Sequence, residues 1–220
     1  MHRMELLHID DTILIIDKPA GLPVLPDGWE PDAPYLVKLL EAEYGKIWIV
    51  HRLDKITSGV MVFARSAEAH RALNLQFERH EAEKVYHCIT ASLPPWEEKV
   101  TKFPLRANVG HSHRTVVDDR KGKPAETSFK VLIRGTEHAL LEARPMTGRT
   151  HQIRVHAYAL GYPLLGDIHY SGPETNLIAR PALHAYSLTF THPASGERVS
   201  FSASYPTDFE QVVTSLQKSI

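Results

Sequence analysis

The sequence contains a single cysteine, Cys88, in 220 residues. One thiol cannot form an internal disulfide, and it excludes a zinc site built from several cysteines. A lone cysteine in this setting suits a reducing compartment. We interpret Cys88 as a packed residue of a strand.

Long apolar runs are also missing. Stretches such as residues 13–16 are far too short to cross a bilayer, which takes about 20 residues. The amino-terminal residues lack the charged-then-apolar layout of a secretion signal. We therefore expect a cytoplasmic protein with no membrane association, whose 43% of hydrophobic residues suffices for a substantial core.

An excess of one charge is absent too, because the net charge is −1, which gives no argument for a nucleic-acid partner. The charges are nevertheless unevenly distributed. Residues 1–43 hold three Lys/Arg against nine Asp/Glu, whereas residues 99–130 hold eight Lys/Arg against three acids, a local balance of +5. On charge alone, a solvated face and a phosphate-binding face explain this basic segment equally well.

Short strands and helices alternate along the chain, without repeats or a linker, so we predict a single domain over residues 1–220 of the α+β class, with a large mixed or antiparallel sheet and flanking helices. The strands are expected at residues 5–10, 12–17, 59–64, 84–92, 127–133, 139–143, 183–191 and 199–203. The helices are expected at residues 34–44, after 66, at 150–160 and after 207.

Several side chains indicate how these elements pack. Ser66 can cap the second helix, whose stripe of Ala69, Leu73 and Phe77 should face inward. Alternation predicts that Phe129, Val131 and Ile133 share one sheet face. Gly161 ends the third helix, and a capping box at Thr207 and Glu210 precedes the stripe of Phe209, Val212, Val213 and Leu216 in the last one.

The first polar motif is His51-Arg52-Leu53-Asp54-Lys55-Ile56-Thr57-Ser58-Gly59. It puts one carboxylate, Asp54, among cations and hydroxyls directly before a buried strand. Loops at strand ends are where sites are usually assembled. The alternative is a structural turn in which Asp54 caps local backbone amides, and this stretch alone leaves both interpretations open.

The second motif, residues 144–156, contains three arginines and no acid between Arg144 and Arg154. Gly148 allows a tight turn, so we expect Arg149 and Thr150 at the amino end of the following helix, where an anion is favoured. His151 and His156 are five residues apart and lie on different helix faces. Without a neighbouring carboxylate they make a poor metal site, and no metal is expected.

The third motif is Lys84-Val85-Tyr86, in which alternation puts Lys84 and Tyr86 on the same side of a strand. A tyrosine on a sheet is more often part of the core than of a catalytic site.

In order and spacing, these three motifs resemble those of the RluA-type pseudouridine synthases. The loop Asp17-Lys18-Pro19-Ala20-Gly21 and the segment Leu183-His184-Ala185 match as well, so the resemblance runs from about residue 6 to about residue 205. His51, rather than glycine, before Arg52 favours this group over the related RsuA-type enzymes. The resemblance implies the pseudouridine synthase fold with a central active-site cleft.

The resemblance also implies roles. Asp54 would be the catalytic aspartate, Tyr86 the aromatic that packs on the target base, Arg149 the cation paired with Asp54, and Arg52 the residue that enters the RNA stack. The enzyme would isomerise a uridine by breaking its N1–C1′ bond, rotating the uracil and joining C5 to C1′. No redox step occurs, so no cofactor is expected. Asp54 would act on the ribose, either at C1′ or by removing a proton from C2′.

The substrate implied is structured ribosomal or transfer RNA, in which a hidden uridine must be flipped out. Further RNA contacts are expected from Lys84, Thr150, His151, Arg106 and Arg114. Because the matching strand begins close to Met1, we expect no S4-like domain before it, and we expect a monomer without a protein partner. The sequence does not identify the RNA or the uridine.

Two other classes fit parts of the pattern. A base-releasing N-glycosylase could use Asp54 at C1′ but would leave an abasic site. An RNA-binding protein without isomerase activity is the other alternative. It would have no use for an aspartate among cations.

Overall fold

The structure is a computed structural model that describes residues 4–26, 33–110 and 114–218. Residues 1–3, 27–32 and 111–113 lie outside it, and with them parts of the expectations about a secretion signal, the acidic segment and the basic segment. The chain forms two compact units, one of Met1–Glu83 with Ala185–Pro206, and one of Lys84–His184 with Thr207–Ile220. We call them unit 1 and unit 2.

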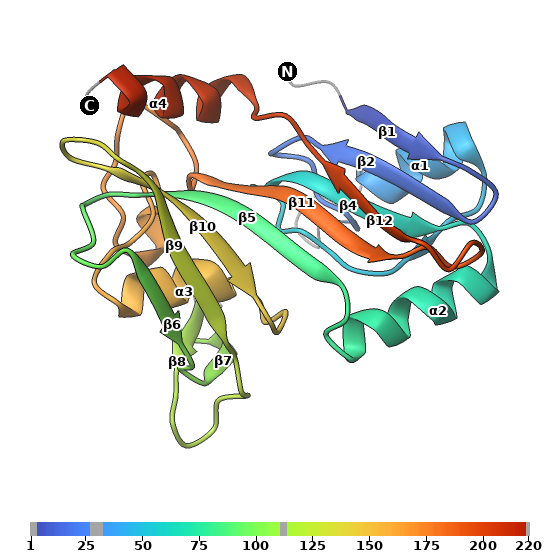
Figure 1. Cartoon of the computed structure of the whole chain (residues 1–220), viewed down its shortest axis with the longest axis horizontal. Coiled ribbons are helices and arrows are strands. Elements are labelled where there is room, and N and C mark those ends of the chain that lie inside the picture. The colour runs from blue at the N-terminus through green and yellow to red at the C-terminus, as the bar shows by residue number, and fades with distance from the viewer. Residues whose placement is uncertain (1–3, 27–32, 111–113, 219–220) are drawn as a thin grey trace. The chain divides into compact units, whose positions relative to one another are not determined.

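Unit 1 is built on a sheet in which the strand order is β1-β2-β4-β11, with β3 paired to β4 and β12 paired to β11 (Figure 1). Its elements are β1 (Glu5–Ile9), β2 (Ile13–Lys18), α1 (Leu36–Tyr44), β3 (Trp48–Ile49), β4 (Ser58–Ala64), α2 (Ala67–Glu78), β11 (Leu183–Thr191, from Ala185 on) and β12 (Arg198–Ser202). The elements predicted here are confirmed, except that the two-residue β3 was not anticipated.

The core of unit 1 forms because strands β2 and β4 carry apolar side chains on both faces. All seven residues of β4 are buried. As predicted, the Ser66 hydroxyl caps α2, accepting a hydrogen bond from the Ala69 N–H at 3.1 Å. Ala69 and Leu73 are fully buried in this core, and Phe77 packs against it.

Unit 2 contains a sheet of strand order β5-β10-β9-β6 and a separate hairpin of β7 and β8, with helix α3 packed against β8, β9 and β10. Its elements are β5 (Glu83–Thr90, from Lys84 on), β6 (Glu98–Thr101), β7 (Leu105–Val109), β8 (Arg114–Val117), β9 (Thr127–Arg134), β10 (Ala139–Pro145), α3 (Gln152–Ala159), the 3-10 helix η1 (Ile168–Tyr170) and α4 (Thr207–Lys218). The β7–β8 hairpin, seen at the bottom of Figure 1, was not predicted, because its strands are short and their apolar residues few.

The predicted packing of unit 2 is largely confirmed. Cys88 has no exposed surface in β5, and burial raises the pKa of its thiol to about 12, so it is an inert packing residue. The stripe predicted for the last helix is buried in α4: Phe209, Val212, Val213 and Leu216.

The prediction that Ile133 shares a sheet face with Phe129 and Val131 is wrong. In the β9–β10 ladder, Val131 lies opposite Leu141, but Ile133 lies opposite Leu140. Neighbouring residues of β10 point to opposite faces, so Ile133 faces the other side. The cause is a β-bulge in β9, an extra residue that simple alternation does not anticipate.

The start of α3 also differs from the prediction. The helix begins at Gln152, with His151 as its N-cap in a left-handed conformation at φ 54°. Arg149 and Thr150 therefore lie in the turn before the helix, not within its first turn. The end is as predicted, with Gly161 at φ 90°.

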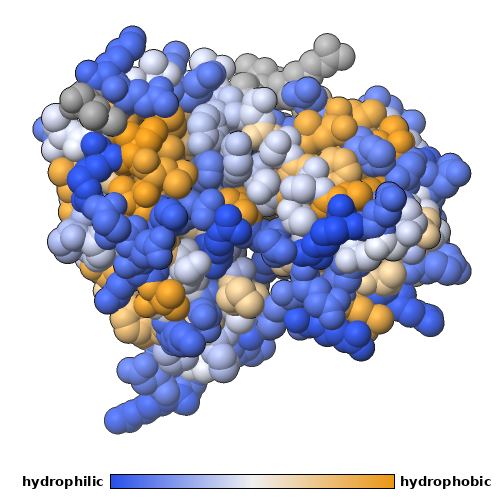
Figure 2. All heavy atoms as spheres, viewed as in Figure 1, coloured by the Kyte–Doolittle hydropathy of each residue, from blue (hydrophilic) through white to orange (hydrophobic). Residues whose placement is uncertain are grey.

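The α+β class is confirmed. The single-domain organisation and the central cleft stay predictions. Among the described residues, no helix is long and apolar enough to cross a membrane. Figure 2 shows hydrophilic residues over most of the face in view, with separate apolar patches between them.

A buried ion pair stabilises unit 2. Arg154 on α3 and Asp167 are 3% and 1% exposed and form two hydrogen bonds, Nε to Oδ2 at 2.7 Å and Nη2 to Oδ1 at 2.8 Å. The Arg154 guanidinium also lies 4.9 Å from the centre of the Tyr170 ring. Each charge is tolerated inside the protein because the other one is present.

We predict that Asp167→Asn lowers the free energy of unfolding by about 3–5 kcal/mol, since it leaves Arg154 buried without its counter-charge. The double variant Arg154→Met with Asp167→Leu should lower the free energy of unfolding clearly less than Asp167→Asn does. Urea unfolding followed by circular dichroism measures both. A double variant as unstable as Asp167→Asn would contradict this explanation.

Candidate active site

Asp54 lies in the turn that leads from β3 into β4. The turn is closed by a hydrogen bond from the Thr57 N–H to the Asp54 carbonyl at 3.0 Å. Leu53 is buried, Arg52 is exposed and Asp54 is half-buried. The turn is thus anchored by its apolar residue, with a cation at the surface and a carboxylate partly shielded from water.

His51 fixes the chain on the amino side of this turn. Its Nε2 accepts a hydrogen bond from the Val62 N–H of β4 at 3.2 Å, which requires that Nε2 carry no proton. Its ring stacks on Phe77 of α2, with centroids 4.9 Å apart and planes 20° apart. His51 therefore orients the strand entry, a role that the motif alone did not reveal.

Lys18 fixes the other side, and sequence reasoning assigned it no role. Its side chain has no exposed surface, and its ammonium donates to the carbonyls of Pro19 and Leu22 at 2.8 Å each and of Lys55 at 3.2 Å. The Gly21 N–H also donates to the Lys55 carbonyl, at 2.8 Å. The loop after β2 is thus bonded to the residue that follows Asp54, and the matched motif 17–21 was the available signal.

Gly59, at the start of β4, has φ 118°, and a Cβ there would lie 2.2 Å from the Ala185 carbonyl oxygen of β11. Only glycine fits such a close approach of two backbones. This explains why the Asp54 motif ends in glycine.

In unit 2, Lys84 and Tyr86 are both half-buried on β5, consistent with the shared side that alternation predicts. Tyr86 lies opposite Ala143 of β10. The Lys84 ammonium donates to the Thr147 carbonyl at 3.3 Å, and burial lowers its pKa to about 8. Lys84 therefore contacts the connection between β10 and α3, which carries Arg149.

Arg149 is exposed in that connection. Its Nε donates to the Pro124 carbonyl at 3.1 Å, and its backbone N–H donates to Oε1 of Gln152 at 3.0 Å. The Arg149 backbone N–H is therefore not available to the anion that we expected at the amino end of the helix. Thr150 is exposed, and His151 Nδ1 lies 2.8 Å from the Tyr170 hydroxyl.

The other arginines of the second motif are held by carboxylates. Arg154 is buried against Asp167, and Arg144 contacts Glu142, with its Nε 2.6 Å from Oε1. Both partners lie outside the stretch between Arg144 and Arg154, so the motif did not show them. Arg149 differs, because its Nε and its backbone N–H bond to a carbonyl oxygen and to an amide oxygen.

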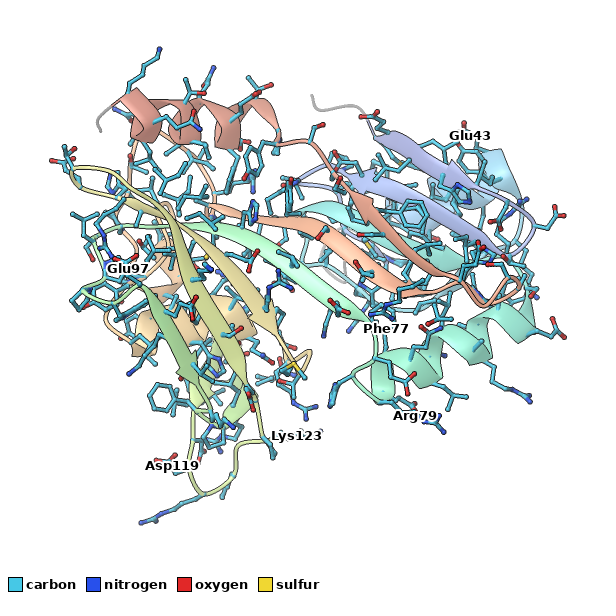
Figure 3. All side chains as sticks on the ribbon, in the orientation of Figure 1. Glu43, Phe77, Arg79, Glu97, Asp119 and Lys123 are labelled. Carbon is cyan, nitrogen blue, oxygen red and sulfur yellow. The ribbon has the colours of Figure 1, made fainter. Side chains whose placement is uncertain are left out.

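Arg106 and Arg114 lie on the β7–β8 hairpin. Arg106 Nε is 2.9 Å from Oδ2 of Asp118, and the Arg114 guanidinium lies 5.1 Å from the centre of the Tyr170 ring. Part of the basic segment is thus ion-paired or packed within unit 2. Figure 3 labels Asp119 and Lys123 in the connection that follows this hairpin.

Asp118, one of the three acids in the basic segment, has a structural role. Oδ1 of Asp118 accepts hydrogen bonds from the Arg120 and Lys121 N–H groups at 3.0 and 2.9 Å. These bonds hold the pKa of Asp118 below its usual value. Asp118 therefore shapes the turn after β8, and its presence does not argue against a basic surface.

The candidate residues are divided between the units. Arg52 and Asp54 belong to unit 1, and Lys84, Tyr86, Arg106, Arg114, Arg149, Thr150 and His151 belong to unit 2. The contacts described above for Asp54, Lys84, Arg106, Arg149 and His151 are all made within the unit to which each residue belongs. In the part of the chain that the structure describes, no three His, Cys, Asp or Glu side chains are placed to hold a metal ion.

Known proteins match the chain over most of its length. A family profile described as RNA pseudouridylate synthase matches residues 12–159. Dual-specificity RNA pseudouridine synthase RluA of Escherichia coli K12 is 38% identical over 93% of this chain and 93% of its own. Ribosomal large subunit pseudouridine synthase D of Neisseria meningitidis serogroup A is 36% identical over 97% of this chain, which spans 61% of that relative's length.

Solved structures agree with this. Human RNA Pseudouridylate Synthase Domain Containing 4 superposes with a TM-score of 0.79 at 27% identity, covering 97% of this chain and 93% of that one. Human RNA Pseudouridylate Synthase Domain Containing 1, at 23% identity and a TM-score of 0.78 over 98% and 95% of the two chains, shares the fold. The fold is thus that of the pseudouridine synthases. The chain belongs to the RNA pseudouridylate synthase family, in its RluA-type group.

The depressed pKa of Lys84 predicts a pH-dependent stability. Burial lowers this pKa from its ordinary value of 10.5 to about 8 in the folded protein, so between these values the unfolded chain holds the proton more tightly. The free energy of unfolding should therefore gain a component that rises with pH from about 8 to 10.5, and Lys84→Met should remove it. Urea unfolding across this range tests the prediction. The same substitution at the exposed Lys99 is the matched control and should leave the rise in place.

Proposed function

We propose that this protein is an RNA pseudouridine synthase that isomerises a uridine in structured ribosomal or transfer RNA. The observation that carries the proposal is that the segment matched by the family, residues 12–159, contains all three proposed catalytic residues, Asp54, Tyr86 and Arg149. The names of the relatives support it, since one is a ribosomal large subunit pseudouridine synthase and another is a dual-specificity RNA pseudouridine synthase. We further propose that it acts in the cytoplasm, as a monomer.

In this proposal Asp54 acts on the ribose of the target uridine. Its turn is held by the Lys18 ammonium, the His51 ring and the buried Leu53, so the carboxylate starts from a fixed backbone. Such preorganisation matters because a nucleophile or base must lie close to its target atom before the reaction begins. Attack on C1′ or removal of the C2′ proton would each release uracil as a stabilised anion.

Tyr86 and Arg149 would complete the reaction. The Tyr86 ring offers a flat face to uracil while the base rotates, and its hydroxyl can take part in removing the C5 proton. Arg149 would keep Asp54 ionised, since a cation within a few ångströms lowers a carboxyl pKa by about one to three units. The reaction needs no redox cofactor, because the product is an isomer of the substrate, and no metal, because uracil can leave as a stabilised anion while a carboxylate acts on the ribose.

RNA binding would use the remaining candidates. The exposed Arg52 is suited to fill the gap left by a flipped base. We propose that Lys84, Thr150 and His151 contact the RNA near the reacting nucleotide, and that Arg106 and Arg114 contact phosphates. Affinity should then fall as salt rises.

The proposal predicts tritium release. Purified protein, without added metal or cofactor, should release tritium from RNA labelled at uracil C5, because pseudouridine formation replaces the C5 hydrogen. Asp54→Asn keeps the size of the side chain but removes its charge, and we expect release to fall by at least about 10³-fold. Ribosomal and transfer RNA are tested separately.

Two outcomes would favour the other classes. Free uracil with an abasic site would indicate a base-releasing N-glycosylase. RNA binding that is unchanged in Asp54→Asn, with no tritium release by the wild type on either RNA, would indicate an RNA-binding protein.

The Tyr86 hydroxyl has its own test. Tyr86→Phe keeps the ring, so RNA affinity should stay within about two-fold, while the reaction stalls after glycosidic cleavage if the hydroxyl serves the C5 proton. Single-turnover kinetics with mass analysis of the nucleotide detects the stalled product. An unchanged rate would remove the hydroxyl from the mechanism.

A further inference from the structure

Gln152 is a buried polar residue to which the proposed chemistry assigns no task. It is the first residue of α3, and only 4% of its surface is exposed. Its side-chain amide makes four hydrogen bonds of 2.7–3.0 Å. A buried amide is costly unless its polar atoms are bonded, so these four partners indicate what the residue holds in place.

The oxygen of this amide holds the connection that carries Arg149. Oε1 accepts from the Arg149 backbone N–H at 3.0 Å and from the Thr147 hydroxyl at 2.7 Å. The Arg149 side chain is fixed separately, by the bond from its Nε to the Pro124 carbonyl at 3.1 Å. The backbone N–H and the side-chain Nε of Arg149 are therefore both hydrogen-bonded to other residues of unit 2.

The nitrogen of the amide ties this connection to the start of β9. Nε2 donates to the Glu126 carbonyl at 2.9 Å and to the hydroxyl of the fully buried Thr127 at 3.0 Å. The Glu126 N–H donates in turn to the Thr147 hydroxyl at 3.1 Å. A closed set of hydrogen bonds thus joins the Arg149 connection to the sheet.

His156 sets the direction of these bonds. Its Nε2 lies 3.0 Å from the Phe103 carbonyl, which can only accept, so Nε2 carries the proton. In the neutral ring, Nδ1 then accepts from the Thr127 hydroxyl at 2.9 Å, which leaves the Thr127 oxygen to accept from Gln152. Burial lowers the pKa of His156 and so favours the neutral ring.

We infer that Gln152, oriented by Thr127 and His156, is the positioning residue that holds Arg149 in its catalytic place. The inference rests on the proposed function, in which Arg149 acts on Asp54. It assigns to the chain Phe103–His156–Thr127–Gln152–Arg149 one task, the placement of a single cation. A displacement of such a group by about 1 Å is enough to slow a reaction about 10²-fold.

The test compares Gln152→Leu and Thr127→Val with the wild type in steady-state tritium release. Thr127→Val keeps the size and shape of its side chain, Gln152→Leu replaces the amide by an apolar side chain, and both remove the side-chain hydrogen bonds. We expect kcat to fall about 10- to 100-fold and KM to stay within about two-fold, because the positioning acts in the transition state. Thr127→Ser, which keeps the hydroxyl, should retain activity close to that of the wild type.

Gln76→Leu is the matched control. Gln76 is also a buried glutamine, and its side-chain amide bonds to the backbone of Thr191 in unit 1, with the Thr191 N–H to Oε1 at 2.7 Å and Nε2 to the Thr191 carbonyl at 2.8 Å. Its substitution should lower stability but leave kcat unchanged. A loss of kcat equal to that of Gln152→Leu would mean that both residues act only through stability, and would overturn the inference.

A double-mutant cycle tests the path through Arg149. In an Arg149→Ala background, Gln152→Leu should cause no further loss of kcat, because its target is gone. The same loss in both backgrounds would overturn the inference.

Hydrogen exchange supplies a readout that does not depend on activity. The Arg149 N–H should exchange at least about ten-fold faster in Gln152→Leu than in the wild type, and equally slowly in Gln76→Leu. Unchanged exchange would contradict the inference even if activity fell. If the wild type released no tritium from any RNA, the proposed function would fail, while the exchange result would still decide whether Gln152 holds this connection.

Discussion

The turn at Asp54 depends on a positive charge buried beneath it. The Lys18 ammonium has no exposed surface and donates to backbone carbonyls on both sides of the junction between the loop after β2 and the turn before β4. A buried ammonium is tolerated only where oxygens surround it. If these two segments separated, the Lys18 ammonium would lose carbonyl oxygens that bond it. The close backbone approach at Gly59 and the stacked His51 ring fix the same turn from its other sides.

In unit 2 a buried polar side chain again fixes a loop by hydrogen bonds, but this side chain carries no charge. There the connection before α3 is held by a neutral amide whose oxygen and nitrogen are both satisfied, and a histidine sets the direction of the bonds. In both units the proposed catalytic side chain is exposed or half-buried, while residues that fix its backbone are buried. This division explains why the motifs mix reactive residues with residues such as Lys18 and Gln152, which never need to meet a substrate.

Much of this arrangement could be predicted from the sequence, and the failures have identifiable causes. Hydrophobic periodicity located α2 and α4. The Ser66 cap located the start of α2, and Gly161 located the end of α3, because these signals depend on residues close in the chain. Ile133 was misplaced because a single bulge reverses alternation. The ion pair of Arg154 was not anticipated, because its partner, Asp167, lies 13 residues away across a turn that no local pattern reveals. The His151 cap required a left-handed residue that is not glycine.

The path of the chain between the two units has a consequence for biosynthesis. Unit 1 takes its strands from two separate stretches of the chain, since residues 185–191 of β11 and the whole of β12 follow the insertion of residues 84–184. A nascent chain that has reached β10 has made β1, β2 and β4 but not β11, which pairs with β4 in the finished sheet. During translation, the edge of β4 that pairs with β11 in the finished sheet therefore stays unpaired until β11 is made. Unpaired strand edges are the surfaces through which chains aggregate. Any truncation before residue 185 should thus be more prone to aggregation than the full chain, however well its remaining segments fold.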